Sequence, residues 1–140
     1  MRKNSTLFAL AFALLVLVGC GNKVKLQGKV TFSDDGNPVP CGFVCFETDT
    51  YSARGDIQPD GTFDVGSLGP KDGLPPGKYR VSISGAERVI GETPGSMGRT
   101  IKRYESLIDT KYENGNTSGL TIDVDASTKK FEFQVDRYQK

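Results

Sequence analysis

Histidine and tryptophan are both absent from this chain of 140 residues. Without histidine the chain cannot form a Ser–His or Cys–His nucleophile pair or a histidine-bearing zinc site, so most familiar hydrolytic machinery is excluded. The lack of tryptophan removes a common stacking platform for sugars, which weakens a carbohydrate site without excluding one. Histidine-dependent catalysis is thus excluded, and we expect no bound metal and no other cofactor.

The chain also has no marked excess of either charge. It has 18 basic and 17 acidic residues. A nucleic-acid-binding surface is typically rich in lysine and arginine, so we expect no nucleic-acid partner. What is abundant is turn chemistry: 17 glycines and 7 prolines accompany an ordinary 36% of hydrophobic residues. This composition favours many short strands over long helices, in one all-β domain.

The N-terminal segment has the pattern of a secretory signal peptide. Arg2 and Lys3 are followed by the apolar run 7–18, which has 12 residues, and then by the small residue Gly19. As a helix this run would span about 18 Å, which is short against a hydrocarbon core of about 30 Å. We therefore predict a signal peptide over residues 1–19.

The signal peptide ends in a sequence that resembles a bacterial lipobox, formed by Leu17, Val18, Gly19 and Cys20. The resemblance implies that the Cys20 thiol receives a diacylglyceryl group and that Cys20 becomes the acylated first residue. Two or three acyl chains anchor a protein durably, since each buried CH₂ contributes about 0.8 kcal/mol. The alternatives are a plain secretory signal with an incidental cysteine, and a membrane helix that is not cleaved.

Gly21 follows the lipobox where lipoproteins carry a sorting residue. The absence of aspartate there favours the outer membrane, on its periplasmic face or at the cell surface, over the inner membrane. Residues 20–23 form a linker, in which the spacer Gly21-Asn22-Lys23 reaches little more than 10 Å. The predicted domain, residues 24–137, therefore lies close to its membrane.

Alternation of apolar and polar residues predicts seven short antiparallel strands in this domain. They lie within residues 24–32, 41–48, 51–57, 61–68, 75–84, 119–124 and 129–136. We expect two hairpins: residues 51–68 reverse at Pro59-Asp60-Gly61, and residues 119–136 bring the two last strands together. Seven such strands without an amphipathic helix predict an immunoglobulin-like or transthyretin-like β-sandwich that follows an N-terminal signal helix.

Several segments resemble the carboxypeptidase regulatory-like, or transthyretin-like, domains of small bacterial lipoproteins. The resemblance covers about residues 24–136 and rests on "GKVTFSDDGNPVP", "ARGDIQPDGTFDVG", "LPPGKYRVSIS" and "TSGLTIDV". It implies an immunoglobulin-like sandwich without catalysis of its own, so we expect a protein that is not an enzyme. The hydroxyisourate hydrolases, enzymes related to transthyretin, depend on histidines and a C-terminal Tyr-Arg-Gly-Ser, and this chain has no histidine and ends "DRYQK".

Cys41 and Cys45 share one predicted strand. Four residues of extended chain separate them by about 13 Å, whereas a disulfide needs Cα atoms within about 7 Å. The two thiols therefore cannot pair with each other, and we expect small, partly buried side chains. A redox role, an intermolecular disulfide and a metal site without histidine are the alternatives.

The connection 85–110 is longer than most loops in compact domains and carries four cations, Arg88, Arg99, Lys102 and Arg103. Beside a lipid-bound N-terminus these side chains form a candidate contact surface for anionic head groups or cell-wall polymers. The alternative is a solvated insertion with one helical turn near residues 101–107.

The sequence thus predicts a non-catalytic, lipid-anchored β-sandwich of the bacterial cell envelope with a binding, assembly or structural role. Its expected partners are the membrane and an unidentified envelope protein or glycan. The alternative function is a lipoprotein that captures a glycan, a peptide or a transported nutrient with the 85–110 loop.

Overall fold

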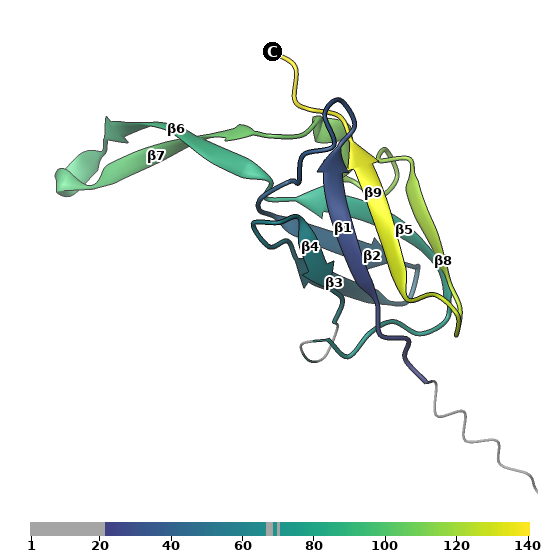
Figure 1. Cartoon of the computed structure of the whole chain (residues 1–140). Helices are drawn as coiled ribbons and strands as arrows, with labels where there is room; N and C mark the ends of the chain where they lie inside the picture. Colours follow the sequence, from purple (N-terminus) through teal and green to yellow (C-terminus); the bar gives the residue numbers. More distant parts are fainter. Residues whose placement is uncertain (1–21, 67–68, 70) are drawn as a thin grey trace, which may run out of the picture.

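The computed structural model describes residues 22–66, 69 and 71–140 (Figure 1). The predicted signal peptide and the lipobox residues Leu17, Val18, Gly19 and Cys20 lie outside these residues. The described residues form nine strands and two short 3₁₀ helices, namely β1 (Gln27–Phe32), β2 (Phe43–Glu47), β3 (Ser52–Asp56), β4 (Thr62–Asp64), β5 (Gly77–Ser84), β6 (Glu87–Pro94), η1 (Ser96–Gly98), β7 (Thr100–Ser106), η2 (Thr110–Glu113), β8 (Leu120–Val124) and β9 (Lys130–Val135).

Seven of these strands make the two layers of a β-sandwich. One sheet has four antiparallel strands in the order β3-β2-β5-β8, and the other has three in the order β4-β1-β9. Each of the seven lies within a segment in which alternation predicts a strand. The all-β sandwich is therefore confirmed at the level of its architecture.

The core lies between the two sheets and is filled by alternate side chains of each strand. Phe46 of β2 contacts Phe63 of β4 and Phe131 of β9, with ring centroids 6.1 and 5.8 Å apart, so aromatic rings bridge the layers. Gly28 of β1 faces the same cluster, and a Cβ atom there would clash with the Phe63 ring. The missing side chain of Gly28 thus makes room for the ring that closes the core.

The strand count is nine and not seven, because the connection predicted as a loop contains β6 and β7. These strands pair with each other as a two-stranded antiparallel sheet. The helical turn expected near residues 101–107 is wrong, since most of that segment is β7. Both faces of this hairpin lie in solvent, and nearly every residue of β6 and β7 is exposed. The alternation of apolar and polar residues that marks a half-buried strand is therefore absent from this part of the sequence.

The hairpin predicted over residues 119–136 does not form, and the one predicted over residues 51–68 is reduced to a single antiparallel bridge between Arg54 and Gly66. Both turns exist, with Gly61 N donating to Gln58 O at 2.8 Å and Thr128 N donating to Asp125 O at 3.1 Å. However, β3 and β4 belong to different sheets, and so do β8 and β9. Each turn carries the chain from one sheet to the other. The strands on either side of the turn still alternate apolar and polar residues, so the local sequence pattern is the same as for a hairpin within one sheet.

The sandwich also contains one parallel pair, which corrects the expectation of antiparallel strands throughout. β9 runs alongside β1 in the same direction, from Gln27 opposite Lys130 to Phe32 opposite Val135. The residues that follow β9 therefore meet the turn that follows β1. At this end of the sandwich lie the C-terminus and the base of β6 and β7, whereas the chain enters β1 at the opposite end (Figure 1).

Candidate functional site

The most distinctive feature of the molecule is the projecting hairpin of residues 87–106, which we call the arm. It extends away from both layers of the sandwich (Figure 1). Its register runs from Glu87 opposite Ser106 to Pro94 opposite Thr100, with an irregularity after Val89. The tip is the short helix η1, which a hydrogen bond from Gly95 N to Arg99 O closes at 2.7 Å.

The arm exposes an unusual amount of apolar side chain. Five of the seven exposed large hydrophobic residues in the described part of the chain lie on it, namely Val89, Ile90, Met97, Ile101 and Tyr104. Met97, at the tip, is 98% exposed. A two-stranded hairpin buries little on its own and is at best marginally stable, and exposed apolar surface commonly marks an interaction site. The arm is therefore the candidate contact surface.

Two cations hold the base of the arm through one carboxylate. Glu105 Oε2 accepts from Arg88 Nη2 at 2.6 Å, and Glu105 Oε1 lies 2.9 Å from Lys140 Nζ. The hydrogen bonds from Arg88 and Lys140 lower the pKa of the Glu105 carboxyl. Only 9% of this side chain is exposed, and Tyr138 N donates to Leu107 O at 3.1 Å beside it, so the C-terminal segment contacts the chain where the arm leaves the sandwich.

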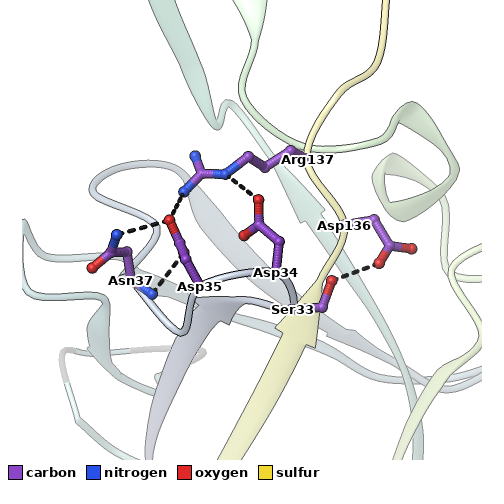
Figure 2. A network of polar contacts seen from close by, with 6 residues as sticks. All are labelled: Ser33, Asp34, Asp35, Asn37, Asp136 and Arg137. Carbon is purple, nitrogen blue, oxygen red and sulfur yellow. Dashed lines mark hydrogen bonds and ion pairs between the residues drawn. The ribbon is translucent and has the colours of Figure 1, made fainter.

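Ion pairs also join the turn after β1 to the C-terminal segment (Figure 2). Arg137 donates from Nε to Asp34 Oδ2 at 2.8 Å and from Nη2 to Asp35 Oδ2 at 2.7 Å. Asn37 N also donates to Asp35, and this backbone hydrogen bond is the main cause of the lowered pKa of that carboxyl. The turn and the C-terminal segment are thus joined by paired charges.

The neighbouring carboxylate, Asp136, extends this fastening to the chain that follows the arm. It accepts from Lys111 Nζ at 2.6 Å, from Ser33 Oγ at 2.7 Å and from the Tyr112 hydroxyl at 3.0 Å (Figure 2 shows the bond to Ser33). These bonds, with Lys111 as the largest cause, lower the Asp136 pKa to about 2. Because Lys111 and Tyr112 belong to η2, these bonds hold the chain that follows β7, the second strand of the arm.

The four cations predicted as a contact surface all lie on the arm. Arg88 is paired with Glu105, and Lys102 lies opposite Glu92 in the register. Arg99 follows η1 at the tip, and Arg103 lies opposite Gly91. The structure brings them together on one hairpin, whose base lies at the end of the sandwich opposite the start of β1 (Figure 1).

Cys41 and Cys45 are both free thiols, which confirms that they do not pair with each other. Cys41 Sγ donates to the Glu87 carbonyl at 3.4 Å, beside the start of the arm. Cys45 lies in β2 between Arg54 and Ser82, and burial raises the pKa of its thiol. A raised pKa leaves less of the reactive thiolate, which argues against Cys45 as a nucleophile.

Residues 22–66, 69 and 71–140 are the part of the chain that the structure describes. No group of three or more cysteine, aspartate or glutamate side chains is arranged there to hold a metal ion. None of the helices in this range is long and apolar enough to cross a membrane.

Comparison with known proteins assigns no family. No family model and no curated protein matches the chain. Similar solved structures include BcpA, the major pilin subunit of Bacillus cereus, with a TM-score of 0.44 and 10% identity over 83% of this chain and 30% of the pilin. A 9R-lipoxygenase from Cyanothece has a TM-score of 0.39 and 16% identity over 83% of this chain and 17% of the enzyme.

A DUF3823 family protein from Parabacteroides merdae is also similar, with a TM-score of 0.36 and 16% identity over 81% of this chain and 45% of that protein. The chain spans less than half the length of each of these structures. Similarities of this size do not identify the family, so the resemblance to carboxypeptidase regulatory-like domains stays a prediction.

Proposed function

We propose that this protein is a non-catalytic module of the bacterial cell envelope, anchored by an acylated Cys20, that binds a protein partner through the arm. The main support for the proposal is that apolar side chains of the arm are exposed to solvent, among them Val89, Ile101 and Tyr104. Burying such side chains against a partner is favourable by roughly 25 cal/mol per Å² of apolar surface.

The backbone of the arm offers a second means of binding. β6 and β7 pair only with each other among the described strands, so each has an outer edge without a strand partner. An open edge can accept an extended segment of another protein by strand addition, with apolar side chains providing selectivity. The fastened base favours such binding, because a preorganised surface loses less conformational entropy when the partner docks.

The arrangement of the sandwich fits a membrane-anchored adaptor. The chain enters β1 at one end of the sandwich and the base of the arm lies at the other, and the 6 residues of β1 span about 20 Å between them. An anchor at Cys20 therefore holds the arm away from the bilayer, where a protein of the envelope can reach it.

A site-specific photocrosslinker at Met97 or Tyr104 tests the arm in intact cells. We expect an adduct of one defined mass, which is lost when Ile101 and another arm residue, Val89, are replaced by serine. A crosslinker at the exposed Thr121 of β8 is the control and should give no such adduct. Equal crosslinking from Thr121, or none from the arm, would contradict the proposal. A thermal shift with a glycan or peptide and no protein adduct would favour ligand capture instead.

Metabolic labelling with an alkynyl fatty acid tests the anchor separately. The natural protein should be labelled and membrane-bound, and Cys20→Ser should lose the label and appear in the soluble fraction. A serine variant that remains labelled and membrane-bound would show that the lipobox interpretation is wrong.

A further inference from the structure

Five lysines from three separate segments of the chain meet at the end of the sandwich where residue 22 lies. Lys23, Lys25, Lys71, Lys129 and Lys130 line one open groove of about 860 Å³. We call this the lysine groove. No local sequence pattern groups these residues, since more than 100 positions separate the first from the last.

Backbone hydrogen bonds bring the three segments together. Val24 N donates to Leu74 O at 2.7 Å and Leu74 N donates to Val24 O at 2.9 Å, which fixes the start of the described chain beside the loop that carries Lys71. Gln27 N donates to Lys129 O at 3.2 Å, where β1 meets the start of β9. The lysine groove is therefore built on paired backbone.

The groove has an excess of positive charge. Lys23 pairs with Asp72 at 2.6 Å, and Lys71 pairs with Asp64 at 3.2 Å. The other three lysines, Lys25, Lys129 and Lys130, make no ion pair with any residue that the structure describes. The nearby carboxylate of Asp125 accepts hydrogen bonds from the backbone of Ser127 and Thr128 within its own turn.

We infer that the lysine groove binds the anionic head groups of the phospholipid bilayer that holds the protein, an inference that rests on the proposed acylation of Cys20. Cys20 precedes Asn22 by two residues, which span at most about 7 Å of extended chain. Acyl chains at Cys20 thus bring this end of the sandwich to the bilayer surface. Head-group phosphates there meet unpaired ammonium groups, while the arm leaves the sandwich at its other end.

The two attachments act together. Acyl chains supply the hydrophobic part of membrane binding, and a basic patch adds an electrostatic part. Each lysine near an anionic surface tightens binding by about fivefold, so three unpaired lysines tighten it by about 100-fold. Binding at a groove on one end also orients the sandwich upright on the bilayer, with the base of the arm at the end away from the lipid.

The test uses residues 22–140, which contain the core between the two sheets and have no acylation site. This chain is mixed with vesicles of equimolar phosphatidylglycerol and phosphatidylcholine, or of phosphatidylcholine alone, in a sedimentation assay. We expect binding to the anionic vesicles only, weakened about 100-fold by the combined Lys25→Gln, Lys129→Gln and Lys130→Gln changes. At about 1 M salt, where the Debye length is about 3 Å, binding should be lost.

The matched control is the combined Arg99→Gln, Lys102→Gln and Arg103→Gln variant, which removes the same charge from the arm. It should bind like the natural sequence, and circular dichroism checks that both variants are folded. Equal binding to both kinds of vesicle, or loss of binding in the arm variant alone, would overturn the inference. Because this chain has no Cys20, the result is independent of the labelling experiment that tests the anchor.

Discussion

The guanidinium carbon of Arg137 lies 3.7 Å from the centroid of the Phe32 ring. The same guanidinium donates to Asp34 and Asp35, so one side chain joins the C-terminal segment to the end of β1 and to the following turn. A cation above an aromatic face contributes about 0.5–2 kcal/mol. This contact stabilises the end of the sandwich from which the arm projects.

Replacing Arg137 should therefore destabilise the fold. We expect Arg137→Ala to lower the free energy of unfolding in urea by about 1–2 kcal/mol, mainly through loss of the ring contact, because exposed ion pairs alone contribute little. Arg80→Ala is the matched control, since its pair with Asp49 is exposed, and it should change the free energy by less than about 0.5 kcal/mol. Equal effects of the two variants would refute the role of the ring.

Stability should fall with acid in a window that Asp136 helps to set. Its pKa is about 2 when folded and about 3.9 in an unfolded chain. The ionised carboxylate therefore contributes its full stabilisation above about pH 4 and loses it as the pH falls toward 2. Thermal unfolding followed from pH 5 to about pH 2 should show a smaller drop for Asp136→Asn than for the natural protein. Asp56→Asn, at an exposed position of β3, should leave the drop unchanged.

Gly28 lies so close to the Phe63 ring that a larger residue at position 28 should destabilise the protein, and a smaller residue at position 63 should relieve that effect. A Cβ atom at this position clashes with the Phe63 ring, so Gly28→Ala should destabilise the protein by about 1–3 kcal/mol. In the Gly28→Ala, Phe63→Leu double variant the smaller leucine side chain removes that clash. The double variant should therefore lose less stability than the two single variants lose in sum. Additive losses in urea unfolding would argue against the contact.

The arm should be dispensable for folding. Arg88 and Glu105 face each other in the register, so an Asn-Gly turn can replace residues 89–104 and keep their ion pair. None of the replaced residues belongs to the core. We expect the free energy of unfolding to change by less than about 1 kcal/mol, while the crosslinked adduct at the arm disappears. A shortened protein that fails to fold would assign the arm a structural role.

The strands of the sandwich were predictable because each has one face in the core. In β2, for example, Val44 and Phe46 are buried while Phe43 and Glu47 are exposed, and this alternation is visible in any half-buried strand. The arm was not predictable by the same signal. Val89 and Tyr104 lie opposite each other with both faces of the hairpin in solvent, so no periodic burial constrains the sequence there.

Some of the candidate contact residues were predictable from the sequence and others were not. The sequence singled out Arg88, Arg99, Lys102 and Arg103 because they are close together along the chain. It missed the apolar members of the arm, whose exposure depends on the projection of the hairpin from the sandwich. It also missed the lysine groove, because its lysines meet only after β9 has paired with β1.

The sequence by itself determined an all-β domain, the positions of the seven sandwich strands, the lack of histidine chemistry and the separation of Cys41 from Cys45. These properties depend on composition and on spacing within single segments. Only the tertiary structure decided which sheet each strand joins, that β9 runs parallel to β1, and that residues 87–106 leave the sandwich as an arm. Strand pairing is decided by contacts between distant segments, and a turn between two sheets leaves the same local pattern as a hairpin within one.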